Sequence, residues 1–106
     1  ARRASHQTAY VASGLAIDFE KRRVSVDGQE IKLTRKEYDL LCTLAQHSGQ
    51  VVTHKQLLAA GWGSTVTDTQ FVRVYVGQLR QKLEADPSAP KLILTEPGIG
   101  YLLSEQ

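Results

Sequence analysis

Several residue types are scarce in this sequence, and each scarcity excludes a class of protein. Cys42 is the only cysteine, so an intramolecular disulfide is excluded and we expect a reducing compartment, the cytoplasm. No apolar run approaches the length that crosses a bilayer, and the cations Arg2 and Arg3 have no apolar stretch behind them. We therefore expect neither a membrane span nor a secretory signal. Methionine is absent even at position 1, so we expect the chain to be a fragment of a longer protein.

Groups that carry catalytic or metal chemistry are also few. The histidines, His6, His47 and His54, have no metal-ligand spacing with Cys42, so we expect no metal site. Cys42 lies in an apolar helical segment, where we expect a packed thiol rather than a nucleophile. No helix follows the Gly98–Gly100 segment, which is therefore a turn and not a nucleotide-binding loop. With no nucleophile, base and orienting group to assemble, we expect neither an enzyme nor a cofactor.

Size and charge leave one broad class. The chain has 106 residues, of which 42% are hydrophobic, enough for one core and too few for two. Its formal net charge of +2 is only mildly basic. A protein with this charge binds nucleic acid only if its cations are gathered on one face. Composition therefore indicates one globular domain and no particular function.

The first third of the chain predicts a small antiparallel sheet. Residues 1–12 are mostly polar and are interpreted as a linker that runs into an edge strand, ahead of a domain over 13–106. Asp27-Gly28 is a two-residue turn signal, because glycine accepts the positive φ that hairpin turns require. Apolar residues alternate with polar ones on both sides of this turn: Leu15, Ile17, Phe19, Val24, Val26, Ile31 and Leu33.

Three helices and a hairpin follow. We predict helices over 33–48, 54–61 and 68–85, each opened by a threonine with Glu or Gln three residues later, the spacing of a capping box. The three boxes are Thr34 with Glu37, Thr53 with Gln56, and Thr67 with Gln70. Gly49 and Asp86-Pro87 mark helix ends, and residues 91–104 predict a β-hairpin. This order predicts an α+β winged helix-turn-helix fold: an N-terminal antiparallel β-sheet, three helices and a C-terminal β-hairpin wing.

The third helix has two distinct faces. Its core stripe, at spacings of four, three and four, is Val72, Val76, Leu79 and Leu83. The opposite face carries Gln70, Val74, Gly77, Gln78 and Gln81, flanked by Arg73 and Arg80. Amides and guanidinium groups pair with base edges, valine packs on thymine methyls, and glycine permits close approach to DNA. A solvated helix face carries similar residues, so the residue types alone leave both interpretations open.

Several segments together resemble the effector domains of OmpR/PhoB-type response regulators. They are residues 33–41, 49–53, 56–58 before Trp62-Gly63, 79–83 and 98–101, in the family's order and spacing. The resemblance spans about residue 14 to the end of the chain. Within that family, residues 72–87 with 95–101 look most like the Kdp-type regulators of potassium-uptake genes.

The resemblance implies a DNA contact for each matching position. The third helix would enter the major groove of double-stranded DNA. Nearest the bases would be Arg73, Val74, Gly77 and Gln78, and on phosphates or sugars Gln70, Tyr75 and Arg80. At the second helix, Trp62 would offer its indole N–H to the DNA backbone, and the amides around Thr53 and Lys55 would hold a phosphate.

The resemblance also implies partners. A receiver domain would lie upstream of Ala1, and its phosphorylation would drive formation of a homodimer on direct-repeat promoter sites. The half-sites would lie one helical turn apart, about 10–11 bp. The loop over 63–68 is where members of the family contact RNA polymerase.

The wing departs from the family pattern. Where many relatives place arginine to enter the minor groove, this sequence has Pro97 and Leu102, and Glu96 adds a negative charge. We expect this wing to approach only the DNA backbone, through Thr95 and the glycine amides.

Two alternatives stay open at this level. Trp62 at the end of the second helix is as consistent with packing between helices as with a phosphate contact. A winged helix that only docks proteins is the alternative function, since the fold permits it and the net charge is low. A docking face would expose more apolar anchors than Phe71 and Val74, so DNA binding is the favoured interpretation.

Overall fold

The computed structural model describes residues 8–63 and 65–105. Its N-terminal part is a four-stranded antiparallel sheet in the order β1-β2-β3-β4. Its strands are β1 (Ala9–Ala12), β2 (Leu15–Asp18), β3 (Arg23–Val26) and β4 (Gln29–Ile31). The predicted turn joins β3 to β4, with φ of 51° at Asp27 and 85° at Gly28. Residues 1–7 of the predicted linker, including His6, lie outside the described residues.

The three predicted helices are present; the first and third are two residues shorter at each end than predicted, and the second ends one residue later. They are α1 (Arg35–Gln46), α2 (His54–Trp62) and α3 (Gln70–Leu83), against predictions of 33–48, 54–61 and 68–85. The first two capping boxes are confirmed. Thr34 Oγ1 accepts from Glu37 N at 3.3 Å while Glu37 Oε1 accepts from Thr34 N at 2.8 Å. Thr53 and Gln56 exchange the equivalent bonds at 3.0 and 2.9 Å.

The third capping box, Thr67 with Gln70, was predicted wrongly. Helix α3 begins after Thr69, whose side chain makes no capping bond. Instead Gln70 N donates to Asp68 Oδ1 at 2.9 Å. A carboxylate two residues before the first helical amide satisfies that amide and is favoured by the helix dipole, so Asp68 displaces the predicted cap.

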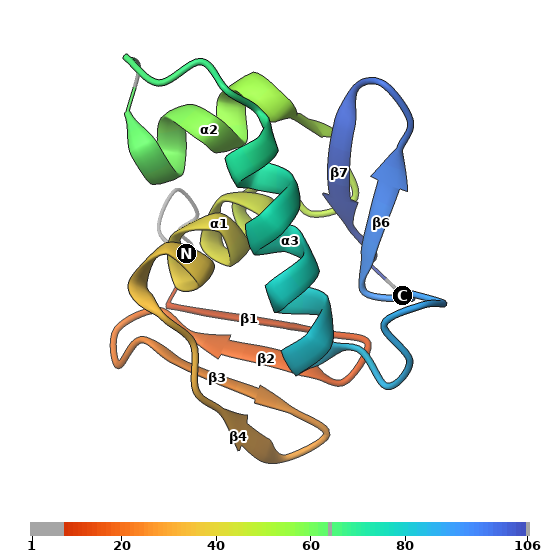
Figure 1. Ribbon diagram of the computed structural model, residues 1–106. Helices are drawn as coiled ribbons and strands as arrows, with labels where there is room; N and C mark the ends of the chain where they lie inside the picture. Colours follow the sequence, from red (N-terminus) through yellow and green to blue (C-terminus); the bar gives the residue numbers. More distant parts are fainter. Residues whose placement is uncertain (1–7, 64, 106) are drawn as a thin grey trace.

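A second, three-stranded sheet closes the fold. Its strands are β5 (Val52–Thr53), β6 (Ile93–Glu96) and β7 (Gly100–Leu103), in the order β5-β7-β6. Gly100 is required at the pairing with β5, because a Cβ there would overlap the carbonyl oxygen of Val52. The β6–β7 hairpin, residues 93–103, corresponds to the predicted wing and is called the wing below (Figure 1).

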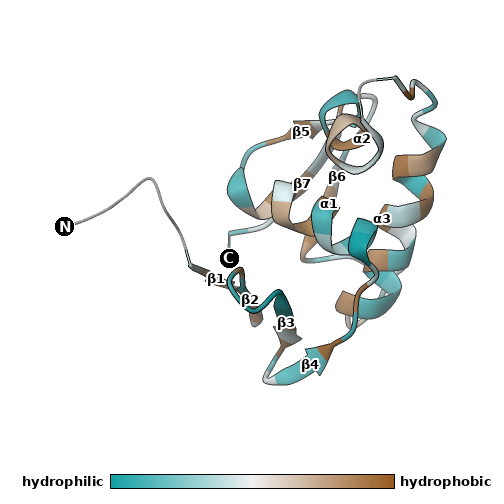
Figure 2. Ribbon diagram, turned by 90° about the vertical axis from the view of Figure 1, so that its left-hand side faces the viewer, coloured by the Kyte–Doolittle hydropathy of each residue, from teal (hydrophilic) through white to brown (hydrophobic). Residues whose placement is uncertain are grey.

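Helix α1 is the centre of the core, since it contacts α2, α3 and β7. In Figures 1 and 2 the helices lie on one side of the β1–β4 sheet, with the wing beside them. The fully buried side chains come from every layer and form one cluster: among them Leu15, Ile17, Leu40, Leu41, Leu44, Leu57, Leu79, Ile93 and Leu103. Among the described residues, no helix is long and apolar enough to cross a membrane.

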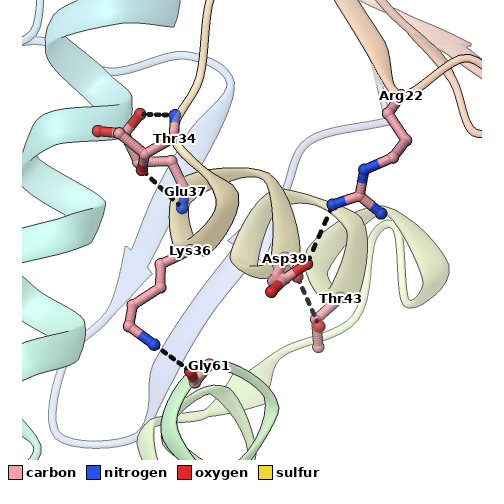
Figure 3. A network of polar contacts seen from close by, with 7 residues as sticks. All are labelled: Arg22, Thr34, Lys36, Glu37, Asp39, Thr43 and Gly61. Carbon is pink, nitrogen blue, oxygen red and sulfur yellow. Dashed lines mark hydrogen bonds and ion pairs between the residues drawn. The ribbon is translucent and has the colours of Figure 1, made fainter.

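Polar contacts orient α1 against its neighbours (Figure 3). Lys36 Nζ donates to Gly61 O at 2.9 Å, which ties α1 to the end of α2. Arg22 Nη2 lies 3.7 Å from Asp39 Oδ1, which ties α1 to the turn between β2 and β3. Cys42 is half-buried against the core, and burial raises the pKa of its thiol, which disfavours the nucleophilic thiolate.

The buried carboxylate of Glu37 joins α1 to α3. Lys82 Nζ on α3 donates to Glu37 Oε1 at 2.7 Å, and the Glu37 side chain is 2% exposed. Burial acts to raise the pKa of Glu37, but the hydrogen bonds from Lys82 and Thr34 outweigh it and hold the pKa below its ordinary value. The ionised carboxylate is therefore part of the folded structure.

This pair predicts a specific pH dependence of stability. A carboxyl whose pKa is lowered by folding stabilises the protein above its unfolded-state pKa, here 4.5, and that contribution is lost as pH falls through the lower folded value. We expect Glu37→Gln to lower the free energy of unfolding at pH 7 by about 2 kcal/mol. Urea denaturation from pH 7 to pH 3 should show this difference shrinking below pH 4.5. The exposed Glu30→Gln is the matched control, and a pH-independent difference for Glu37→Gln would contradict the assignment.

Candidate nucleic-acid interface

Helix α3 is the outermost helix of the bundle. It lies in front of α1 in Figure 1 and at the right-hand margin in Figure 2. Its predicted core stripe, Val72, Val76, Leu79 and Leu83, is buried as expected. The opposite face is exposed and carries the predicted residues Gln70, Arg73, Val74, Gly77, Gln78 and Gln81. Val74 is 46% exposed, a large apolar side chain in the centre of this polar face.

Gly77 lies in the middle of that exposed face without an internal reason to be glycine. A Cβ at Gly77 would meet no atom within 4 Å, and its φ is not in the left-handed region. Glycine within a helix costs about 1 kcal/mol relative to alanine. The bare backbone at this position is therefore not explained by packing of the described residues.

The side of α3 that faces α2 is aromatic. The Trp62 ring lies 5.7 Å from that of Phe71 in a stacked arrangement and 5.1 Å from that of Tyr75, edge to face. Lys36 Nζ lies 5.3 Å from the Trp62 ring centroid. Trp62 and Tyr75 are half-buried, so both predicted phosphate contacts also hold α2 against α3, whereas Phe71 is 44% exposed.

The side of α3 that faces the wing carries Arg80. Its Nε and Nη2 donate to the carbonyl oxygen of Ile93 at 3.2 and 2.9 Å, and Nη2 donates to Thr95 Oγ1 at 2.7 Å. Its Cζ lies 5.5 Å from the centroid of the Tyr101 ring, which is buried. The structure thus places Arg80, predicted to contact phosphate or sugar, against β6.

At the start of α2, two of the amides around the predicted phosphate contact already have acceptors within the protein. The amide of Thr53 already donates to Gln56 Oε1 at 2.9 Å, and the amide of His54 donates to Ile99 O at 3.1 Å. Lys55 is exposed in the first turn of the helix. Lys55 can offer an anion its charged side chain and its own amide at the helix terminus. It is not part of a ring of several amides.

The exposed part of the wing is apolar and acidic. Thr95, Glu96 and Pro97 are exposed, as is Ile99 at 51%, and residues 92–104 contain no Lys or Arg. The loop predicted to contact RNA polymerase, 63–68, includes Ser64, which lies outside the described residues. The described part of this loop borders a hollow of about 250 Å³, lined by Lys55, Leu58, Ala59, Gly63, Val66, Thr67 and Thr69.

Sequence reasoning missed Glu84, a buried carboxylate at the end of α3. It accepts hydrogen bonds from the amides of Lys91, Leu92 and Ile93 at distances from 2.8 to 3.0 Å. An acid directly after the core residue Leu83 was the only sequence signal. Among residues 8–63 and 65–105, no group of three or more His, Cys, Asp or Glu side chains is arranged to hold a metal ion.

An N-terminal sheet, three helices and a hairpin beside an outward third helix define a winged helix-turn-helix domain. The family described as "Transcriptional regulatory protein, C terminal" matches residues 28–103, more than half of the chain. The chain belongs to this family, the OmpR/PhoB-type winged-helix domains, which are transcriptional regulators and not enzymes.

Individual relatives agree with this assignment. The chain is 42% identical over 96 residues to the transcriptional regulatory protein KdpE of Mycobacterium tuberculosis, a match that covers 90% of this chain and 42% of KdpE. It is 43% identical over 93 residues to PrrA of Mycobacterium leprae, covering 87% of this chain and 40% of PrrA. It therefore spans about two fifths of the length of these curated relatives.

A solved structure matches nearly the whole fold. The DNA-binding domain of RstA from Klebsiella pneumoniae, crystallised in complex with the RstA box, superposes with a TM-score of 0.85 at 30% identity. The match covers 94% of this chain and all of the RstA chain, so the N-terminal sheet, helices and wing are all shared.

The environment of Gly77 predicts a stabilising substitution. Because a methyl group meets nothing and the helix gains propensity, Gly77→Ala should raise the free energy of unfolding by about 0.5–1 kcal/mol. Chemical denaturation at pH 7 measures this directly. Gly61→Ala in α2 is the comparison variant: it also replaces a helical glycine, but its added Cβ would lie 3.6 Å from Leu40 Cδ2, in contact with the core. A loss of stability in Gly77→Ala would mean that the folded structure itself requires glycine at this position.

Proposed function

We propose that this domain binds double-stranded DNA sequence-specifically, as the output domain of a two-component response regulator. The observation that carries the proposal is the outward face of α3, where amides, Arg73 and Val74 surround a glycine that no packing requires. An α-helix fits the major groove of B-DNA, and these groups match base edges and thymine methyls. Membership of the transcriptional regulator family supports it.

The proposed contacts divide into base readers and backbone contacts. Arg73, Val74, Gly77 and Gln78 face the bases. The contacts with the DNA backbone come from three places: Gln70 and Tyr75 on α3, Thr53, Lys55 and Trp62 at or on α2, and Thr95 on the wing. The wing has no cation to insert into the minor groove, so it follows the backbone only.

We further propose that the regulated genes serve potassium uptake. Support comes from the similarity to KdpE and from residues 72–87 and 95–101. PrrA is as similar, so the target sequence must be tested directly.

In the longer protein, a receiver domain would precede this domain and promote its pairing on direct repeats. One domain with few phosphate contacts binds weakly, and pairing raises affinity through effective concentration. The loop over 63–68, beside the hollow under Val66, is the proposed contact with RNA polymerase.

Fluorescence anisotropy tests the proposal. The domain is titrated into a labelled Kdp-type promoter duplex and a scrambled duplex across a salt series. Preference for the promoter, with affinity falling steeply as salt rises, is the expected result. Equal weak binding to both duplexes would remove the potassium assignment, and no binding to either would favour a protein-docking module.

Substitutions on α3 should distinguish recognition of specific bases from non-specific electrostatic attraction to DNA. We expect Arg73→Ala and Gln78→Ala each to cost about 1–3 kcal/mol on the preferred duplex and much less on a scrambled one. Arg23→Ala, exposed on β3 in the N-terminal sheet, controls for lost charge. Equal losses on both duplexes would show that these side chains do not read bases.

Gly77→Ala should separate stability from binding in one variant. The added methyl holds α3 away from the groove floor, so affinity for the preferred duplex should fall about tenfold while the domain becomes more stable. Anisotropy and denaturation on the same preparation measure both quantities. Unchanged affinity would remove Gly77 from the interface.

A further inference from the structure

Within residues 8–63 and 65–105, strand β6 has one edge without a partner strand. It is the outer strand of the β5-β7-β6 sheet and pairs with β7 on one side only. Two side chains from the end of α3 occupy its other edge. Glu84 accepts from the amides of Lys91, Leu92 and Ile93, and Arg80 donates to the carbonyl oxygen of Ile93. One carboxylate and one guanidinium therefore bond the backbone of Ile93, the first residue of β6, where a neighbouring strand would otherwise pair.

Arg80 also reaches the exposed part of the wing. The same Nη2 that donates to Ile93 donates to Thr95 Oγ1 at 2.7 Å, so three hydrogen bonds join this guanidinium to β6. Because Thr95 Oγ1 accepts from Arg80, the hydroxyl proton of Thr95 points elsewhere and can be donated outward. The bond from a cation polarises the hydroxyl and makes it a stronger donor.

We propose that Arg80 and Glu84 form a clamp that fixes the wing to α3, so that helix and wing meet DNA as one rigid surface. In this role Arg80 is a positioning residue and not a phosphate contact, and it aims the Thr95 hydroxyl at the DNA backbone. The inference rests on the proposed DNA-binding function and deepens it.

The composition of the wing explains why such a clamp is needed. Long cationic side chains reach phosphates over a range of distances, but residues 92–104 contain none. The exposed donors left to the wing are the Thr95 hydroxyl and backbone amides, which act only within about 3 Å of an oxygen. Their contribution therefore depends on how the protein holds the wing relative to α3.

Lysine at position 80 distinguishes the two roles. It keeps the charge, so it preserves most of a phosphate contact, but its single ammonium lacks the planar fork that spans Ile93 O and Thr95 Oγ1. If Arg80 positions the wing, Arg80→Lys should weaken binding as much as Arg80→Gln does, about tenfold, with an unchanged salt slope.

The experiment uses wild type, Arg80→Lys, Arg80→Gln, Glu84→Gln, Thr95→Val, Thr95→Ser and the exposed control Arg23→Gln. Each variant is first shown to be folded by its thermal transition. Affinity is measured across a salt series on the tightest duplex that wild type selects from a randomised pool. Residual dipolar couplings and ¹⁵N relaxation of the free domain report the orientation and mobility of the wing relative to α3.

Support requires several results together. Both Arg80 variants lose about tenfold, Thr95→Ser keeps its affinity, and the Arg80→Lys and Thr95→Val losses are not additive. The wing of the free Arg80 and Glu84 variants becomes more mobile relative to α3. Arg23→Gln resembles wild type in both measurements.

Other results overturn the clamp and are distinct from failure of the proposed function. Near-wild-type binding by Arg80→Lys, with a salt slope reduced by about one in Arg80→Gln, would make Arg80 a phosphate contact. An unchanged wing in the free variants would also remove the clamp. If wild type selects no duplex, the proposed function fails, and the positioning role fails with it, even where the wing loosens.

Discussion

The rest of the structure depends on the burial of one stripe of α3 against α1. Val72, Val76 and Leu79 are all at most 1% exposed, and their insertion into the core determines which side of α3 faces outward. The helical period then places the glutamine side chains and Gly77 on the opposite side. One flank of α3 lies against Trp62 and the other against β6. The Glu37–Lys82 pair sets where α3 crosses the start of α1. A change in this packing would rotate every exposed residue of α3.

Much of this arrangement is predictable from short-range patterns. The alternation in 15–33, the turn at Asp27-Gly28 and the capping boxes at Thr34 and Thr53 depend on residues close in sequence, and the structure agrees with each. The box at Thr67 was wrong because two candidate caps, Thr67 and Asp68, are adjacent, and only the path of the loop decides between them. The family resemblance predicted the fold, and the match over residues 28–103 confirms the family.

The surroundings of charged side chains were not predictable in the same way. Arg80 has the sequence position of a DNA contact, and nothing in its neighbours reveals that β6, 13 residues away, passes beside it. Glu37 lies in the first turn of α1 and Glu84 directly follows α3; acids at such positions are usually solvated, and the burial of these two follows from partners at 82 and at 91–93. Long-range polar contacts are specified by the tertiary structure and not by local propensity, so the exposed face of α3 was easier to predict than the contacts that hold the helix in place.

The covered edge of β6 has a consequence for domains held side by side. Open strand edges pair with the edges of other chains, and this is a common route to aggregation. The proposed tandem binding sites would bring copies of this domain to high local concentration. An open strand edge at the wing would then favour pairing between the sheets of neighbouring copies. The amides of 91–93 and the carbonyl of Ile93 are already bonded to Glu84 and Arg80, so the start of β6 offers a neighbouring strand no free backbone group at Ile93. Copies bound side by side on the proposed tandem sites would therefore be less able to pair their sheets through the start of β6.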